Sequence, residues 1–263
     1  MAAGPGGSGE RTAEGPQSAL TAPQPPVTGN DGRIEAGAPA RLDGAGEARH
    51  STSLPRLAAV QPLIRAYRPA DLDAVYDICV RTADAGGDAR GQYSSDRLMG
   101  DIFAAPYVTL EPEHAHVLDD GTGAVVGYVL GTADTVRFAQ RYRDEWLPAT
   151  AGRYPHPVDP PVTREDLMLW LHEHPERMVV PELAGYPAHL HIDLLPQWQG
   201  KGWGRGLISA FLAGLRDAGV PRVHLGMAVT NVEARAFYDR LGFTEIPVPG
   251  ADTVTYLGRS TTE

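Results

Sequence analysis

Apolar residues in the last third of the chain follow two periods in turn, first of two residues and then of three to four. Between Ala188 and Leu195 the pattern alternates, so Leu190, Ile192 and Leu194 share one face of a predicted strand. The apolar face of a predicted helix follows at Leu207, Ile208, Phe211, Leu212 and Leu215. Gly219 and Pro221 then supply a helix stop signal.

The rest of the chain from Leu63 continues this succession of strands and helices. Further strands are predicted at Leu63–Tyr67, His114–Leu118, Ala124–Leu130, Val223–Val229, Phe243–Val248 and Thr253–Leu257. Further helices are predicted from Pro69, at Ser95–Phe103, near Thr135–Trp146 and at Arg164–Glu173. A last helix is expected where Thr230 and Glu233 have the spacing of a capping box. Strands and helices that follow one another in this way indicate an α/β fold.

Two segments depart from this rhythm. Residues 1–60 hold 10 Gly and 7 Pro and no aromatic residue, so we expect a disordered tail before a domain at 61–259. Residues 134–187 hold eight prolines and several aromatic residues, and they are predicted to form an insertion in the domain. Packing of an accessory helical layer is the expected use of those aromatic residues.

Charge and cysteine content exclude several classes of function. The formal net charge is −10, without a cluster of basic residues, so neither nucleic acid nor an anionic membrane is an expected partner. The single cysteine, Cys79, cannot form an internal disulfide and excludes a zinc site built on CxxC pairs. No apolar run is long enough to span a bilayer and no signal pattern opens the chain, so a cytoplasmic protein is expected.

One glycine-rich loop carries the first chemical signal. Gln199–Gly206 joins the end of a predicted strand to the start of a helix, and it contains the single lysine of the chain, Lys201. Alternate glycines let successive backbone N–H groups turn inward, and the helix N-terminus adds unpaired donors, so the loop suits a phosphate. A Walker loop is absent from the sequence, and Arg205 and Leu207 stand where a dinucleotide fingerprint needs glycine.

The spacing Gln199-x-x-Gly202-x-Gly204 resembles the acyl-CoA pyrophosphate loop of the GNAT acetyltransferase superfamily. A second motif agrees, because the run from Asn231 to Phe243 matches the helix and glycine turn that these enzymes carry after their fifth strand. The resemblance implies a mixed, mostly antiparallel sheet whose fourth and fifth strands splay apart around acetyl-CoA as co-substrate.

A narrower resemblance concerns the run from His189 to Gly200. It is similar to the acetyltransferase-like domain attached to eukaryotic O-GlcNAcases and to its free-standing bacterial relatives. The catalytic competence of that domain is doubtful in the eukaryotic enzymes. This resemblance therefore implies an alternative function, an inactive acyl-CoA-binding or protein-interaction module.

The family resemblance assigns roles to individual residues. Leu194 and Leu195 would lie along the pantetheine arm, and Asn231 would bind that arm. Tyr238 would protonate the departing thiolate and also contact the cofactor. The pyrophosphate would be held mainly by main-chain amides of the loop, with added charge from Lys201 and Arg205 and a contact from Gln199. The loop residues assigned to cofactor binding are Gln199, Gly200, Lys201, Gly202, Trp203, Gly204, Arg205 and Gly206.

The general base is less defined by sequence. His189, His191 and Asp193 alternate on one strand face, about 7 Å apart per two residues, so Asp193 or His191 could deprotonate an amine directly or through water. Asp193 is the first candidate and a hydrogen-bonded polar stripe is the alternative. His-x-His pairs also occur at 114/116 and 172/174, but no third ligand accompanies them, so no metal is expected.

The sequence thus predicts an acetyl-CoA-dependent N-acetyltransferase acting on a primary amine by direct attack in a ternary complex. The acceptor would bind near residues 85–95 and the insertion, where an acidic, aromatic-lined groove would suit a cationic small molecule or a peptide lysine. A homodimer is left open.

Overall fold

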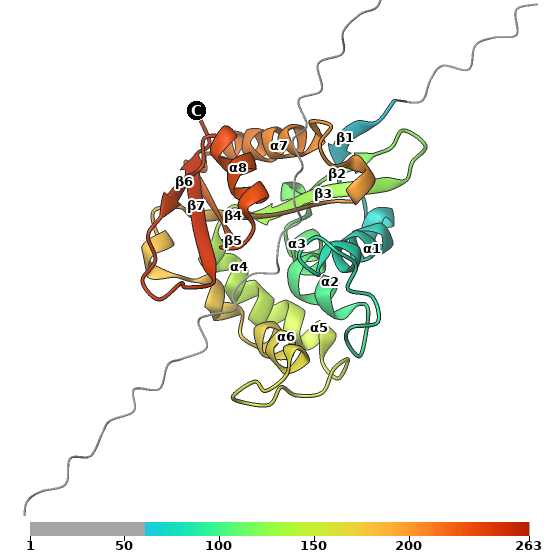
Figure 1. Cartoon of the computed structure of the whole chain (residues 1–263), viewed down its shortest axis with the longest axis vertical. Coiled ribbons are helices and arrows are strands. Elements are labelled where there is room, and N and C mark those ends of the chain that lie inside the picture. The colour runs from blue at the N-terminus through green and yellow to red at the C-terminus, as the bar shows by residue number, and fades with distance from the viewer. Residues whose placement is uncertain (1–60, 263) are drawn as a thin grey trace, which may run out of the picture.

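The predicted strands assemble into one twisted sheet in the computed structural model, which describes residues 61–262; the predicted tail at 1–60 lies outside them. The order across the sheet is β1-β2-β3-β4-β5-β7-β6 (Figure 1). The strands are β1 Leu63–Ala66, β2 His116–Asp119, β3 Val125–Thr132, β4 Ala188–Leu194, β5 Arg222–Ala228, β6 Thr244–Ile246 and β7 Val254–Ser260. Each of the seven strands matches a prediction to within a few residues.

All neighbouring strands are antiparallel except β4 and β5, which run parallel. These two strands pair only at Ala188 with Val223 and His189 with His224. Beyond His189, β4 remains paired with β3 on its other edge, while β5 remains paired with β7. The two halves of the sheet therefore separate from this point on, which confirms the expected splay.

Helices cover both faces of the sheet (Figure 1). One face carries α7 (Trp203–Asp217) and α8 (Val232–Arg240). The other face carries α1 Leu72–Thr82, α2 Leu98–Phe103, α3 Ala105–Leu110, α4 Thr135–Arg141, a π-helical turn Tyr142–Trp146, α5 Leu147–Thr150 and α6 Arg164–Glu173. No helix of residues 61–262 is both long enough and apolar enough to cross a membrane.

Two local predictions were wrong. The helix α3 was missed because Pro106, Tyr107, Val108 and Leu110 are all buried, so the segment has no polar face that would reveal a helical period. The helix α8 is capped by Asn231 and not by a Thr230–Glu233 box. The Asn231 Oδ1 accepts from the backbone N–H of Ala234 at 3.0 Å, which shifts the helix start by one residue.

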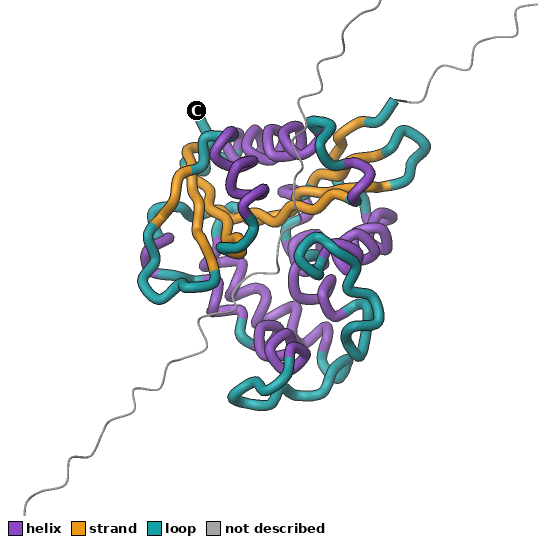
Figure 2. Tube along the Cα trace, in the orientation of Figure 1, coloured by secondary structure: helices purple, strands orange, loops and turns teal. Residues whose placement is uncertain are grey.

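The insertion docks on α2 through the fully buried carboxylate of Asp101. Asp101 accepts hydrogen bonds from Tyr76, from Tyr154 at 2.6 Å and from Arg153 at 3.1 Å. The Trp146 indole donates to the Asp101 carbonyl at 2.8 Å. Figure 2 shows the helices of this region gathered with α1–α3 on one face of the sheet. The aromatic residues of the insertion are thus used for packing, as expected.

Candidate acyl-CoA and acceptor site

The glycine loop ends where the backbone turns sharply into α7. Gly200 has φ +68° and Gly202, the residue before the helix, has φ +85°, a left-handed conformation that favours glycine. The first backbone bond of the helix runs from Gly206 N–H to the Gly202 carbonyl. The N–H groups of residues 203–205 therefore have no partner inside the helix and can bind an anion.

The later glycines of the loop serve packing. A Cβ on Gly206 would lie 2.7 Å from Ile64 of β1, and one on Gly204 would lie 3.2 Å from Phe237 of α8 and 3.8 Å from Leu194. These close approaches hold the start of α7 against both the sheet and α8. The loop glycines thus have two separate tasks, a turn that exposes N–H groups and a tight junction that fixes their direction.

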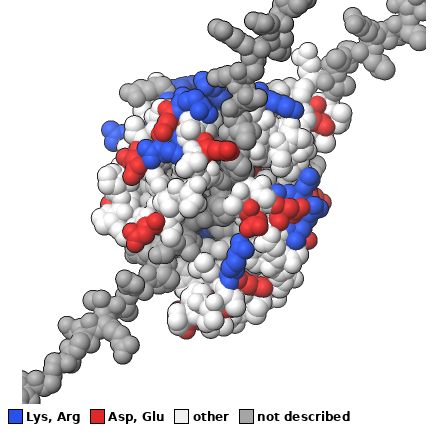
Figure 3. All heavy atoms as spheres, in the orientation of Figure 1, with Lys and Arg blue, Asp and Glu red and all other residues white. Residues whose placement is uncertain are grey.

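Side chains of the loop mostly support its backbone. The Gln199 amide donates to the Leu194 carbonyl at 2.9 Å, which ties the loop to the end of β4. The Lys201 ammonium lies 5.6 Å from the Trp198 ring centre, and Trp198 and Trp203 lie 6.5 Å apart between centres. Figure 3 shows basic side chains gathered along the edge where α7 and α8 lie, a surface suited to phosphate groups.

The splay leaves the edge of β4 from Leu190 to Leu194 without a strand partner toward β5 in the described part of the chain. An extended amide-containing chain can add to such an edge through backbone hydrogen bonds. The Leu195 N–H donates to the carbonyl of Val126 in β3. This N–H is therefore not available to a chain that adds to the free edge of β4.

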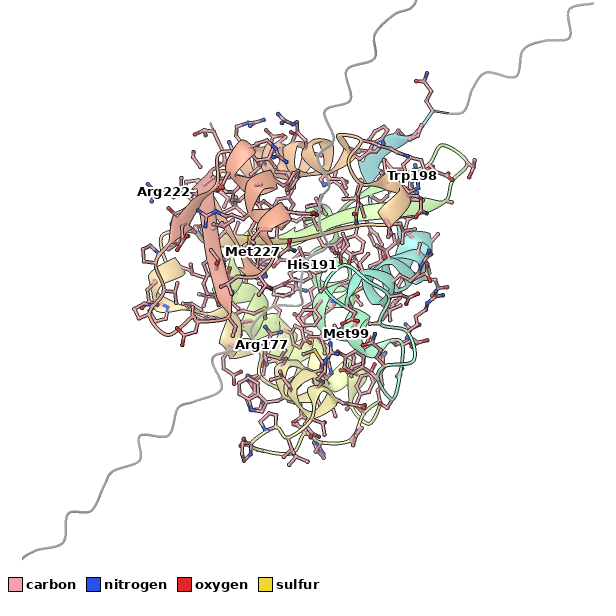
Figure 4. All side chains as sticks on the ribbon, in the orientation of Figure 1. Met99, Arg177, His191, Trp198, Arg222 and Met227 are labelled. Atoms are coloured by element: carbon pink, nitrogen blue, oxygen red, sulfur yellow. The ribbon has the colours of Figure 1, made fainter. Side chains whose placement is uncertain are left out.

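A cavity of about 80 Å³ opens at the splay, on the face of the sheet that carries α1–α6. Its walls come from α2 and α3, from the insertion at residues 177–178, from β4 at 189–191, from β5 at 224–226 and from Tyr256 of β7. Figure 4 shows His191 near the centre of the molecule, whereas Trp198 of the glycine loop lies toward the β1 end. The free edge of β4 runs from the cavity toward the glycine loop.

His191 and Asp193 form a hydrogen-bonded pair beside this cavity. The His191 Nε2 lies 2.9 Å from Asp193 Oδ2, and the Tyr128 hydroxyl donates to the same oxygen at 2.6 Å. Because a carboxylate only accepts, Nε2 carries the proton and Nδ1 carries the lone pair of the imidazole. His191 lines the cavity, whereas Asp193 is not among its lining residues. The structure thus brings both sequence candidates together and gives them different positions.

Cys79 completes a buried cluster with this pair. Potential ligand atoms of Cys79, His191 and Asp193 all lie within 4.8 Å of one another. Burial raises the pKa of the Cys79 thiol, which disfavours the thiolate that a metal would need. The expected absence of a metal stays a prediction.

His189 and His224 also line the cavity, and both are held in the neutral form. Burial lowers the pKa of His224 to about 4, and its Nδ1 lies 2.8 Å from the Tyr186 carbonyl. Burial, followed by electrostatic effects of His224 and of the Arg177 charge, lowers the pKa of His189 well below its usual range. The hydroxyl of Tyr107 lies 2.7 Å from His189 Nε2. These two rings therefore act as fixed neutral walls.

Tyr238 lies in α8, on the opposite face of the sheet from the cavity walls of α2 and α3. It is fully buried, and its ring packs edge-on against Phe237 and Phe243 at centre distances of 5.1 and 5.4 Å. Burial and the charge of Asp193 raise its pKa, so the phenol keeps its proton. Its role as an acid and the contact of Asn231 with CoA stay predictions.

Sequence reasoning missed several residues of the cavity. Arg177 comes from the proline-rich part of the insertion, and Tyr107 from the unpredicted helix α3. Nothing in the sequence distinguishes Arg177 from the other arginines of the chain. Both residues reach the site only because the insertion and α3 fold against β4.

Comparisons with known proteins agree with this architecture. A family model described as "Acetyltransferase (GNAT) family" matches residues 75–243. The crystal structure of SsHAT is 60% identical in sequence, covers 77% of this chain and 100% of its own, and superposes with a TM-score of 0.74. A mycothiol acetyltransferase from Nocardiopsis dassonvillei is 52% identical over 48 residues, which is 18% of this chain and 14% of that protein.

The matched segment thus spans about one seventh of the length of that curated relative. None of these proteins tests the narrower resemblance to O-GlcNAcase-attached domains, which stays a prediction.

Proposed function

Because the chain belongs to the acetyltransferase (GNAT) family, we propose that it transfers the acetyl group of acetyl-CoA to a primary amine within a ternary complex. The observation that carries this proposal is a cavity lined by an oriented imidazole at the point where β4 and β5 separate. A thioester laid along the free β4 edge would end beside that imidazole.

The binding of acetyl-CoA is supported by three features of this chain. The turn at Gly202 exposes the N–H groups of residues 203–205 for the pyrophosphate. The unpaired edge from Leu190 to Leu194 offers backbone groups to the pantetheine amides. Gln199 fixes the loop to the carbonyl of Leu194 and so holds these two features at a constant distance.

We assign His191 as the base that accepts the proton of the amine. In the neutral ring the lone pair is on Nδ1, since Nε2 donates its proton to Asp193. Asp193 in turn is fixed by Tyr128 and acts as a positioning residue, as in other carboxylate–imidazole pairs. This assignment gives His191 the role of base, for which the sequence placed Asp193 first.

The reaction then balances with two proton movements. The amine nitrogen attacks the acetyl carbon, a C–N bond forms and the C–S bond breaks. His191 takes the proton that the amine loses, and the departing thiolate takes a proton from the Tyr238 hydroxyl. Burial keeps the Tyr238 hydroxyl protonated before the reaction, so the proton is present when the thiolate leaves.

The test combines binding and turnover. Acetyl-CoA at 100 times its dissociation constant should stabilise the protein by about 2.7 kcal/mol, measured as a shift of the melting temperature. Release of free CoA thiol is then followed with a panel of primary amines. His191→Gln should lower kcat by about 100-fold, the size typical of a lost general base, and should leave the acetyl-CoA shift unchanged.

His156→Gln, on a side chain that is 96% exposed, is the matched control and should leave both readings unchanged. A melting shift without thiol release from any amine would favour the acyl-CoA-binding module. No shift at millimolar acetyl-CoA would exclude both functions.

A further inference from the structure

Arg177 is a charged residue in the wall of the cavity whose charge is not matched by an acid. Its Nε donates to the Leu171 carbonyl at 3.0 Å, and its guanidinium carbon lies 5.8 Å from the Phe103 ring centre. Among residues 61–262, no Asp or Glu oxygen lies within ion-pair distance of it. The neighbouring acid, Glu176, pairs with Arg143 on the surface.

The rest of the cavity does not neutralise this charge. Among the described residues, no Asp or Glu lines the cavity, and the carboxylate of Asp193 is hydrogen-bonded to His191. His189 and His224 are neutral. The charge of Arg177 lowers the pKa of His189, after the larger effects of burial and His224, and it opposes the larger effect of burial, which raises the pKa of Tyr256. Arg177 is thus the only Arg, Lys, Asp or Glu among the described residues that line the cavity.

We propose that the acceptor carries an anionic group on the same small molecule as its amine, and that Arg177 binds this group. The inference rests on the acetyl transfer proposed above. A guanidinium offers a carboxylate, sulfonate or phosphate a fork of parallel N–H donors. A second ammonium group would instead meet the charge of Arg177. The acidic groove for a cationic amine, expected from the composition of the insertion, is absent from this cavity.

The geometry also limits the length of the acceptor. The Phe103 ring contacts both Arg177 and His191, with its centre 5.8 Å from the guanidinium carbon and 6.3 Å from the imidazole centre. Arg177 and His191 are therefore no more than about 12 Å apart. Hydrogen bonds of about 3 Å at each end leave at most about 6 Å between amine and anion, a limit that a short aminocarboxylate meets.

The test uses amines of equal length that differ only in the charge of the far end. One set is 4-aminobutyrate, its amide and 1,4-diaminobutane, and the other is β-alanine, its amide and 1,3-diaminopropane. Taurine and phosphoethanolamine distinguish sulfonate and phosphate from carboxylate. In thiol release with saturating acetyl-CoA, an anionic amine of at least one length should exceed its neutral and cationic partners at least 10-fold in kcat/KM.

Variants then assign the effect to Arg177. Arg177→Gln should raise KM for the anionic amine about 10- to 100-fold, the range for hydrogen bonds to charged groups, with kcat and acetyl-CoA binding kept. Arg177→Lys loses the fork of parallel N–H donors but keeps the charge, so it should retain part of the preference. Arg164→Gln, on the surface of the same insertion, is the control and should leave KM unchanged.

The outcomes separate this inference from the proposed function. Turnover that is equal for all three end groups, or highest for diamines, would overturn the anionic acceptor while acetyl transfer stands. If no amine releases thiol, calorimetric titration of the CoA-saturated protein with the anionic amines decides. Binding to the wild type but not to Arg177→Gln supports the anion site, and absent or equal binding overturns it.

Discussion

At the scale of single residues, one face of β4 holds three polar side chains, His189, His191 and Asp193, and each has a different environment. His189 is enclosed by Tyr107 and Thr135, at 2.7 and 2.8 Å, and is kept neutral as a wall of the cavity. His191 lines the cavity and is oriented by Asp193. A period of two places these residues on one face, but only their neighbours separate a wall, a base and a positioning residue.

The role of Tyr238 can be tested by removing one oxygen atom. Tyr238→Phe keeps the ring packed against Phe237 and Phe243 but cannot donate a proton, so kcat should fall by about 100-fold or more. Acetyl-CoA affinity should stay within a factor of two to three of the wild type. Steady-state kinetics and calorimetric titration measure these two quantities.

Tyr142→Phe is the matched control for this experiment, since Tyr142 is also a fully buried tyrosine but its hydroxyl contacts His172 in the insertion. It should leave kcat near the wild-type value. Equal turnover in Tyr238→Phe and the wild type would remove the phenol from the mechanism.

At the scale of elements, the site depends on how α7 begins. The helix starts at Trp203 after a left-handed residue, and two glycines further on allow it to lie against β1 and α8. The Lys201 ammonium lies near the Trp198 ring. The N–H groups at the start of α7 belong to the backbone, so their direction is set by the backbone conformation. Phosphate binding should therefore depend more on backbone conformation than on side-chain charge.

Gly202→Ala tests this dependence. The new Cβ would meet no atom within 4 Å, so its effect is the strain of a left-handed alanine, about 1–2 kcal/mol. Both the free energy of unfolding and the affinity for acetyl-CoA should decrease. Chemical denaturation and titration with acetyl-CoA provide the two measurements.

Gly214→Ala in the middle of the same helix is the control. A Cβ there also meets no atom within 4 Å, so this change should raise stability by about 0.5–1 kcal/mol and leave the affinity unchanged. Lys201→Ala should weaken acetyl-CoA only modestly. A complete loss of binding in Lys201→Ala, with Gly202→Ala unaffected, would assign the phosphate to side chains instead of the backbone.

At the scale of the whole molecule, folding brings the insertion and the two halves of the sheet around one buried group of histidines. His224 is neutral in the folded protein because burial lowers its pKa from about 6.5 to about 4. The unfolded chain binds this proton at higher pH than the folded protein does. The contribution to stability is therefore present above pH 6.5 and is lost as the pH falls from 6.5 toward 4.

The expected loss from His224 alone is about 3 kcal/mol, from a pKa difference of about 2.5. Urea unfolding at a series of pH values between 7 and 4 measures it. His224→Gln, whose amide can still donate to the Tyr186 carbonyl, should flatten this dependence, whereas His172→Gln should flatten it to a smaller extent. An unchanged pH dependence in His224→Gln would contradict the buried neutral histidine.

The sequence by itself determined the strands, the main helices, the glycine loop and the family, because each of these depends on a local period or a fixed spacing. The splay of β4 and β5 was predicted only through the resemblance, and the pairing that stops at His189 is a tertiary feature. The presence of Arg177 and His191 in the wall of one cavity, and the absence of Asp193 from that wall, were decided by the fold alone. Potential, burial and distance across a cavity arise from residues far apart in the chain, and no local pattern contains them.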